Sequence, residues 1–511
     1  MTNHAWIAVL DFGSPHTQKI ARGVRQLRIY SEILAWHTSA SELARRRPAG
    51  IVLSDSSVSI LDPNAPLCDP QLFELGIPIL GIGYGMQMTA QLLGGALEPA
   101  AAEVTSIKLS TSDELCAGLP PQWETRLSAG AQVARLPEGF LRLAHSTAYP
   151  NAAMVHPQRK IWGLQFNPEL PETPYGTDIL RNFARQICGC QDDWQSPQII
   201  PASIAAIQSR VGREQVICGL SGGVDSAVVA VLLQRAIGQQ LHCIFVDNGL
   251  LRADEAAQVQ ATFAGTFGIN LHVVDARARF LADLKGVIDP EQKRKRIGKR
   301  FIEVFAAEAR RLGKIKFLAQ GTIYPDVIES ISPLGGAAAL VKSHHNVGGL
   351  PPDLQFELIE PLRELFKDEV RELGRALGLP DSIIKRQPFP GPGLAVRIIG
   401  EVTAARVALL QQAERCLQEE MERYEQRHQL WQYFAVLLPV FSVGVKDAGR
   451  TYENVIALRA VTSREGMTAQ WARLPADLLA RIATRISNEV RGINRVVYDI
   501  SSKPPATIEW E

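Results

Sequence analysis

A chain of 511 residues is long enough for two to four domains, and 46% hydrophobic with 21% charged residues is typical of a soluble globular protein. The formal net charge of +1 argues against a large nucleic-acid-binding surface, and there is no apolar run of about 18 residues to predict a membrane span. The seven cysteines are scattered and odd in number, and the first residues do not form a secretion signal, so we expect a cytoplasmic protein.

Residues 5–190 alternate short β-rich runs, such as "WIAVLDFG", with helical stretches, such as "TQKIARGVRQL". This alternation predicts an α/β domain with a parallel sheet and helices on its faces. The polar, proline-containing segment 188–201 is the predicted boundary to the next domain.

The stretch "GIGYGMQ" (81–87) follows an apolar run and precedes a helical run, which predicts a strand, a tight turn and a helix. Folds of this kind hold a catalytic nucleophile at such a turn. Gly83 occupies that point here and has no side chain. The turn alone leaves two readings open: a catalytic turn that lost its nucleophile, or an unrelated connection.

A second β/α run begins near residue 214, and its first strand leads into "SGGVDS" (221–226) and then a helix. Glycines let the backbone approach a polyanion, and the helix N-terminus adds a partial positive charge. The two serines can donate to phosphate oxygens, and Asp225 can hold Mg²⁺. The segment lacks the GK[ST] of a Walker A loop, and a glycine-rich turn without a ligand is the alternative reading.

After residue 386 the pattern changes again. A long helical segment (402–427) precedes strand-like runs, among them "WQYFAVLLPVFSVGV" and "RVVYDIS", which predicts an α+β region. The final residues "KPPATIEWE" (503–511) contain two prolines and apolar side chains, so we expect a tail that is docked on the fold.

The phosphate loop resembles that of the N-type ATP pyrophosphatases. The chain resembles the GMP synthase family nearly end to end, with very specific motifs from residue 213 onward. The resemblance is carried by "FVDNGLLR" (245–252), "KRKRIGKRF" (293–301), "AQGTIYPDVIES" (319–330), "KSHHNVGGLP" (342–351), "EPLRELFKDEVR" (360–371), "FPGPGLAVR" (389–397) and the terminal "KPPATIEWE". It implies a flavodoxin-like class I glutamine amidotransferase domain (1–192), a doubly wound parallel-sheet ATP pyrophosphatase domain (193–386) and a C-terminal α+β dimerisation domain that also binds XMP (387–511). A homodimer through the last domain is the corresponding expectation.

In that family XMP is adenylated by ATP with Mg²⁺, and ammonia then displaces AMP to give GMP. The resemblance implies ATP contacts from Ser221, Gly222, Gly223, Val224, Asp225, Ser226, Val246, Lys367 and Asp368. It implies XMP contacts from Arg294, Arg397, Lys503, Ile508 and Glu509, and catalytic roles for Asp326, Glu329, Lys342, His344 and His345 in a helix and a lid.

Several of these residues have plainer readings. Arg294 lies in a basic cluster of the kind that usually forms a solvated helix face, and the adjacent Lys367 and Asp368 do not share one face of a helix. One position departs from the family pattern: "VGVKDAGR" has Ala448 in place of an aspartate that contacts XMP, with Asp447 one residue away. This departure puts strict selectivity for XMP in doubt.

The first domain departs from the amidotransferase pattern at four separate motifs. Gly83 replaces the nucleophilic cysteine, Asn167 replaces the histidine base, and Glu169 of the triad remains. The oxyanion-turn glycines are replaced by Asp55 and Ser56, and the family's "SHGD" reads "SAGA" at 128–131. Because glycine cannot form a thioester and an amide is a poor base, we expect no glutaminase activity. Free ammonia, or ammonia from a separate glutaminase, would then be the nitrogen source.

Two rival functions remain at this stage. One is a specialised paralogue that adenylates a modified purine nucleotide or uses another nucleophile. The other is a non-catalytic regulatory or binding homologue, which the intact phosphate loop and C-terminal tail argue against. Pyrophosphate exchange across purine nucleotides would separate the XMP aminase from the specialised paralogue.

Overall fold

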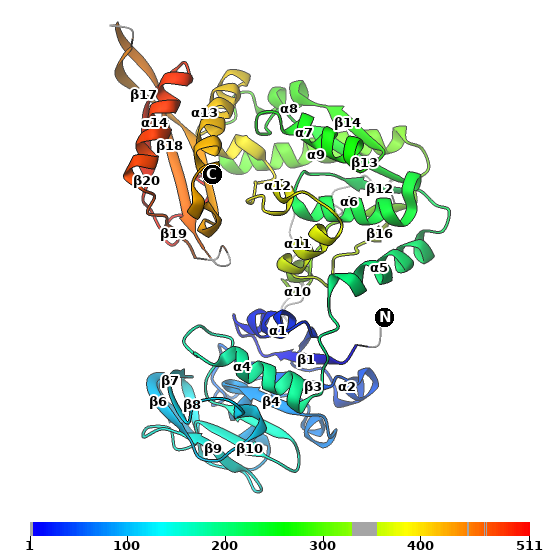
Figure 1. Ribbon diagram of the computed structural model, residues 1–511, viewed down its shortest axis with the longest axis vertical. Helices are drawn as coiled ribbons and strands as arrows, with labels where there is room; N and C mark the ends of the chain where they lie inside the picture. Colours follow the sequence, from blue (N-terminus) through cyan, green and yellow to red (C-terminus); the bar gives the residue numbers. More distant parts are fainter. Residues whose placement is uncertain (1–3, 330–354, 447–448, 464–465, 467) are drawn as a thin grey trace. The chain divides into compact units, whose positions relative to one another are not determined.

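The structure, a computed structural model, describes residues 4–329, 355–446, 449–463, 466 and 468–511 (Figure 1). The candidates Lys342, His344 and His345, and the position of Ala448, lie outside the described residues. The chain divides into unit 1 (Met1–Ala202 with Tyr324–Lys342) and unit 2 (Ser203–Ile323 with Ser343–Glu511). The three-domain partition with boundaries at 192/193 and 386/387 stays a prediction.

Unit 1 is built on a nine-stranded mixed sheet in the order β2-β1-β3-β4-β11-β10-β9-β6-β7. Its strands are β1 (Trp6–Asp11), β2 (Tyr30–Ala35), β3 (Gly50–Leu53), β4 (Ile79–Ile82), β6 (Glu103–Leu109), β7 (Gln122–Leu127), β9 (Leu141–His145), β10 (Ala153–His156) and β11 (Ile161–Leu164). A separate antiparallel ribbon pairs β5 (Ala96–Ala100) with β8 (Gly130–Arg135).

The sheet of unit 1 is parallel in only one half. Strands β2, β1, β3, β4 and β11 run parallel, as the alternation of strands and helices predicts. The other four strands pair antiparallel, so the sheet is mixed and the predicted parallel arrangement holds for one half of it. Short alternating runs such as "QWETRL" indicate a strand with one buried face but carry no information on its direction.

The helices of unit 1 are α1 (Thr17–Gln26), α2 (Ala40–Arg46), α3 (Tyr84–Leu92), α4 (Gly176–Arg181, continued as a π-helix Asn182–Ile187) and α10 (Tyr324–Glu329). The core is the buried face of β1, β3 and β4, against which α3 packs. Helix α5 (Ser196–Val211) begins inside the segment 188–201 that the sequence marks as a boundary, because Ser196 and Pro197 suit the first turn of a helix.

Unit 2 contains a fully parallel five-stranded sheet in the order β14-β13-β12-β15-β16. Its strands are β12 (Val216–Gly219), β13 (Leu241–Asp247), β14 (Leu271–Asp275), β15 (Phe317–Ala319) and β16 (Glu357–Ile359). Its helices are α6 (Val224–Ile237), α7 (Glu255–Gln260, continued as a π-helix Ala261–Thr266), α8 (Arg277–Leu284), α9 (Pro290–Arg311), α11 (Lys367–Ala376) and α12 (Asp381–Ile384).

A second sheet in unit 2 is formed by β17 (Gln432–Lys446), β18 (Gly449–Thr462), β19 (Gln470–Trp471) and β20 (Ile493–Asp499). Helices α13 (Ala404–Glu422) and α14 (Ala476–Glu489) pack on each other and on this sheet (Figure 1). Strand β17 pairs antiparallel with β18, and β20 runs parallel to β18. This matches the predicted α+β region.

One apolar core joins the two sheets of unit 2. It includes Ile217 and Leu318 from the parallel sheet, Leu410 from α13 and Ile482 from α14. Across the described helices, none combines the length and apolarity that a bilayer crossing requires.

Candidate functional site

The predicted phosphate loop lies between the carboxyl end of β12 and the first turn of α6. Gly222 has φ +75°, a conformation that favours glycine. Ser226 Oγ accepts from the Ser221 amide at 3.2 Å and lies 3.0 Å from Ser221 Oγ, and the Gly223 amide donates to Ser221 Oγ at 3.3 Å. The two serines therefore hold the loop in shape, and α6 directs its N-terminus, with a partial positive charge, at the same place.

Two cationic side chains from outside the loop contact it. The Lys367 ammonium, at the start of α11, pairs with Asp225 Oδ2. Arg386 donates to the Gly222 carbonyl at 2.7 Å and pairs with the nearly buried Glu255. Lys367 thus has a partner in the loop that lies far away in the sequence, while its side chain remains 41% exposed.

The loop fits a metal-bound polyphosphate. Asp225 Oδ1 is buried and has no hydrogen-bond partner among the described residues. No group of three or more His, Cys, Asp or Glu side chains suited to a metal occurs in the described part of the chain. Mg²⁺ is commonly held by one or two carboxylates together with substrate phosphates, so one aspartate at this loop is a suitable donor set.

The other residues predicted for this chemistry are placed as follows. Val246 lies buried near the carboxyl end of β13, beside β12, and Asp368 follows Lys367 in the first turn of α11. Gly321 passes the loop so closely that a Cβ on it would lie 3.1 Å from Asp225 Cβ. Asp326 and Glu329 both lie on the helix α10, which belongs to unit 1.

The C-terminal tail is docked on unit 2 and carries Lys503, Ile508 and Glu509, three of the residues predicted for XMP. Arg397, fully buried, forms two hydrogen bonds with Glu509 at 2.8 and 3.0 Å, and its Nη1 lies 3.8 Å from Glu414. Ile508 packs on the small apolar cluster that contains Phe434, and the Lys503 ammonium donates to the Gly466 carbonyl at 2.8 Å.

Arg294 lies on the exposed side of α9 and donates to the backbone carbonyl of Glu511. Its neighbour Lys293 is buried and pairs with the Glu511 carboxylate. Burial lowers the pKa of Lys293, and the Glu511 carboxylate opposes that shift. The basic cluster is therefore not simply a solvated helix face, because two of its residues hold the tail.

In unit 1 the turn at Gly83 keeps the backbone of a nucleophile turn. Gly83 joins β4 to α3 with φ +53° and ψ −110°, a conformation that is strained for any residue with a side chain. A Cβ on Gly83 would lie 2.5 Å from Asp55 Oδ1. The space in which a nucleophile would stand is therefore filled by the Asp55 carboxylate.

Asp55 is bound where an oxyanion hole would be expected. Its Oδ1 accepts from the Tyr84 amide at 2.9 Å and from the Ser56 amide at 2.9 Å. Its Oδ2 accepts from Asn167 Nδ2 at 3.2 Å. The backbone amide after an elbow nucleophile is the usual oxyanion donor, and this one is already bonded to a carboxylate within the protein.

Asn167 joins this carboxylate to the remaining triad residue. Its Nδ2 also donates to Glu169 Oε1 at 2.9 Å, and its Oδ1 accepts from Ser128 Oγ at 2.8 Å. Asp55, Ser128 and Asn167 line a hollow of about 390 Å³. The four substituted motifs thus meet in space and form one hydrogen-bonded network.

Burial raises the pKa of the Glu169 carboxyl to about 7, with a smaller contribution from the nearby Asp55 charge, while hydrogen bonds from its own backbone and Asn167 oppose the shift. A pKa raised above the ordinary 4.5 means that the folded protein binds this proton more tightly than the unfolded chain. The stability gained from this proton is complete below about pH 4.5 and is lost as the pH rises through 7.

We therefore expect Glu169→Gln, which stays neutral, to become more stable relative to the wild type as the pH rises from 5 to 8. A raised pKa of this size corresponds to about 1–3 kcal/mol, or several degrees in Tm for a unit of this length. Thermal unfolding at the two pH values measures it, with the exposed neighbour Glu172→Gln as control. A Tm difference that does not change with pH would contradict the assignment.

Reasoning from sequence missed Arg386 and Lys293, and it did not predict the contacts of Asp55. The sequence signal for Arg386 was weak, because it is only a charged residue beside "QPFPGPG". The signal for the buried Lys293 was also weak, because it is one lysine in a basic cluster. Asp55 was noticed as a substitution, but its contact with the Tyr84 amide depends on the packing of β3 beside β4.

Comparisons with known proteins match three separate parts of the chain to family descriptions. The family description "Glutamine amidotransferase class-I" matches residues 8–187, "NAD synthase" matches 200–298, and "GMP synthase C terminal domain" matches 419–510.

Three similar proteins extend along the whole chain, and each is named a glutamine-hydrolysing GMP synthase. The protein from Thermosynechococcus vestitus is 51% identical over 99% of this chain and 96% of its own. That from Carboxydothermus hydrogenoformans is 52% identical over 99% of both chains. That from Acetivibrio thermocellus is 51% identical over 100% of both.

Proposed function

Because the chain belongs to the GMP synthase family, we propose that it is a ligase that converts XMP to GMP with ATP and uses ammonia in place of glutamine. The O2 oxygen of XMP attacks the α-phosphorus of ATP, and pyrophosphate leaves. Ammonia then attacks C2 of the adenylyl-XMP intermediate, AMP leaves with the O2 oxygen, and a proton is released.

The loop of unit 2 supports the first step. Ser221 to Ser226 would hold the ATP phosphates, with α6 and the Lys367 ammonium offsetting their charge. Asp225 would bind Mg²⁺, whose charge reduces the repulsion between the triphosphate and the XMP phosphate. Val246 and Asp368 are proposed neighbours of the nucleotide at the same edge of the sheet.

The tail supports binding of XMP. Lys503, Ile508 and Glu509 lie on one docked segment, and Arg294 and Arg397 each contact that segment. We assign these five residues to XMP. Asp326, Glu329, Lys342, His344 and His345 are the proposed catalytic group, with the last three outside the described residues.

The use of ammonia rests on one observation about Asp55. Its carboxylate fills the space beside Gly83 and also accepts the hydrogen bond of the Tyr84 amide. Glutamine hydrolysis needs a nucleophile, a base and a free oxyanion donor at this place. Here Gly83 stands at the position of the nucleophile, and Asn167 stands at the position of the base. The oxyanion donor, the Tyr84 amide, is already hydrogen-bonded to Asp55. The nitrogen would therefore come from free ammonia or from a separate glutaminase.

Product identification tests this function. The purified chain is incubated with ATP, XMP and Mg²⁺, together with either NH₄Cl or glutamine, and GMP, AMP and glutamate are separated by chromatography. We expect GMP with NH₄Cl only, at a rate that rises with pH as neutral ammonia increases. Glutamate formation, or GMP formation with glutamine, by the single chain would contradict the use of ammonia alone.

The acceptor is tested separately, because Ala448 stands where the family has an aspartate that contacts XMP. Exchange of labelled pyrophosphate into ATP is measured with XMP and with other purine nucleotides. We expect exchange with XMP. Exchange with only a modified nucleotide would favour the specialised paralogue, and no exchange with any of them would favour a binding homologue.

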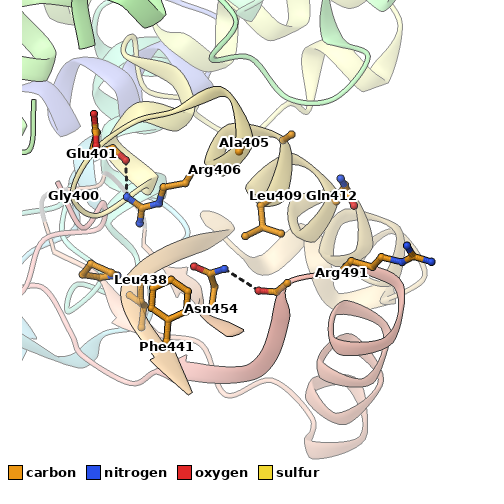
Figure 2. Close-up of a pocket in the computed structure, with 13 residues that line it drawn as sticks. Gly400, Glu401, Ala405, Arg406, Leu409, Gln412, Leu438, Phe441, Asn454 and Arg491 are labelled. Atoms are coloured by element: carbon orange, nitrogen blue, oxygen red, sulfur yellow. Dashed lines mark hydrogen bonds between the residues drawn. The ribbon is translucent and has the colours of Figure 1, made fainter. Parts of the chain in front are cut away.

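We also propose a homodimer through the outer part of β17 and β18. Exposed apolar side chains gather there, namely Val440, Phe441, Val443, Val445 and Tyr452, with Val445 and Tyr452 77% and 70% exposed. Phe441 also borders a hollow of about 700 Å³ beside Leu438, Leu409 and Asn454 (Figure 2). A contiguous apolar surface of this kind marks an interface, and a second copy of this chain is the occupant that the family resemblance implies.

Sedimentation of Val445→Lys tests the dimer. We expect the wild type to sediment as a dimer and the variant to dissociate at the same concentration, since a charge is costly in an apolar interface. Leu61→Lys, at an exposed leucine of unit 1, is the control and should remain dimeric. A monomeric wild type would contradict the proposal.

A further inference from the structure

The C-terminal tail is fastened to unit 2 at several points. Lys503 exchanges two backbone hydrogen bonds with Ala469, at 2.7 and 3.0 Å. Trp510 Nε1 donates to Asp499 at 2.9 Å, and Glu509 accepts from Gln432 at 2.7 Å. Each of these contacts fixes the tail at a single residue. None of them alone determines the path of the whole tail.

Arg459 makes contacts of a different kind, because one buried guanidinium reaches three backbone carbonyls of the tail and one carboxylate of β20. It lies toward the carboxyl end of β18, opposite Phe434 of β17 and Asp499 of β20, and is 1% exposed. Its Nε donates to the Ile508 carbonyl at 3.3 Å, its Nη2 to the Thr507 carbonyl at 3.1 Å, and its Nη1 to the Ser501 carbonyl. Its Nη1 also lies 3.2 Å from Asp499 Oδ2.

This arrangement couples the charge of Arg459 to the docking of the tail. A buried guanidinium must have its donors satisfied, and three of the four acceptors are backbone carbonyls at residues 501, 507 and 508. If the tail leaves, Asp499 is the only one of these four partners that stays in a strand. Docking of the tail is therefore favoured by the need to satisfy the arginine as well as by the tail's own apolar contacts.

The segment that Arg459 holds carries the residues assigned to XMP. In the sequence, Lys503 lies between Ser501 and Thr507, whose carbonyls accept from Arg459. The carbonyl of Ile508 is itself an acceptor, and Glu509 is the next residue. A lysine has a single point of charge and three donors on a flexible stem, so it cannot reproduce the flat fork of an arginine that reaches three carbonyls.

We propose that Arg459 is a positioning residue that fixes Lys503, Ile508 and Glu509 for XMP without touching the nucleotide. This inference rests on the proposed function. It predicts a defect that is specific to XMP, because the phosphate loop for ATP lies on the other sheet of unit 2 and does not contact the tail through Arg459.

The test compares Arg459→Lys with wild type in two measurements. In steady-state assays we expect the KM for XMP to rise about tenfold or more, with the KM for ATP changed less than twofold. In hydrogen–deuterium exchange without nucleotide, the peptide 500–511 should exchange at least about tenfold faster, since the amide of Lys503 is hydrogen-bonded to the Ala469 carbonyl only while the tail is docked. Arg495→Lys, an exposed arginine on β20, is the matched control and should change neither.

The KM measurements can contradict the positioning role of Arg459. An unchanged KM for XMP, or an equal rise of both KM values, overturns the positioning role. If Arg459→Lys does not fold, Asp499→Asn replaces it, since this variant keeps the side-chain shape but removes the carboxylate that faces Arg459. Failure of the proposed function is distinguishable: the wild type would not turn over XMP, whereas the exchange measurement reports on the tail without turnover.

Discussion

Replacing Lys367 with methionine is expected to slow ATP-dependent adenylation of the acceptor by about 100- to 1,000-fold, the usual loss when one preorganised charge is removed from a reacting centre. The Lys367 ammonium pairs with Asp225 in the loop that we assign to the ATP phosphates. Without it, one positive charge that offsets the triphosphate is lost and the Asp225 carboxylate is no longer held in place. Pyrophosphate release, and pyrophosphate–ATP exchange in the absence of ammonia, measure the adenylation step directly.

The control for this variant is Lys316→Met. Lys316 has a similar exposure (47% against 41%) and a comparable ion pair, to Glu357 at 3.2 Å. It precedes β15 at the amino end of the parallel sheet, whereas the phosphate loop follows the carboxyl end of β12, which runs parallel to β15. We expect its rate to stay within about twofold of wild type. If Lys367→Met adenylates the acceptor at a rate within tenfold of wild type, Lys367 does not contribute to the ATP site.

The Lys367 contact shows what a linear pattern can and cannot predict. The strand, glycine turn and helix around "SGGVDS" were predictable, because each depends on residues that are adjacent in the sequence. The partner of Asp225 was not, since 142 positions separate it from Lys367 and only the order of strands β12, β15 and β16 brings α11 to the loop.

The tail gives a second example. Its docking was predictable from prolines and apolar residues near the end of the chain. The pairing of Arg397 with Glu509 was not predicted, although both were assigned to XMP, and neither was Arg459, whose sequence context "ALRAV" looks like an ordinary strand. The sequence does not show whether an arginine in a strand is buried. Arg459 is buried, and this burial is the reason why its donors need the carbonyls of the tail.

The retained first domain can be understood from the network around Asp55. Loss of a nucleophile and a base would leave buried polar groups without partners, which is costly. Asp55, Ser128, Asn167 and Glu169 instead satisfy one another and the Tyr84 amide. Under the proposed function the domain kept its fold because the substituted residues stabilise the site that they inactivate.

This network leads to the last prediction, that restoring the nucleophile alone restores no glutaminase and damages the domain. In Gly83→Cys the new Cβ would lie 2.5 Å from Asp55 Oδ1 in a backbone conformation with φ +53°. Backbone strain of about 1–3 kcal/mol and overpacking of about 1–3 kcal/mol add to a loss of roughly 2–6 kcal/mol, which should lower the Tm of unit 1 by about 4–24 °C. Calorimetry and glutamate release measure the two effects.

A double-mutant cycle separates the clash from the strain. Gly76→Cys, at a glycine with φ +69° and no atom within 4 Å of the added Cβ, is the control that carries strain without a clash and should lose clearly less stability. Adding Asp55→Gly to Gly83→Cys should recover part of the loss, because the pair interacts directly, and it also frees the Tyr84 amide. Glutamine hydrolysis is then expected only when Asn167→His supplies a base as well. If Gly83→Cys alone hydrolyses glutamine, or melts with the wild type, the Asp55 carboxylate does not close this site, and the proposed reliance on ammonia loses its structural basis.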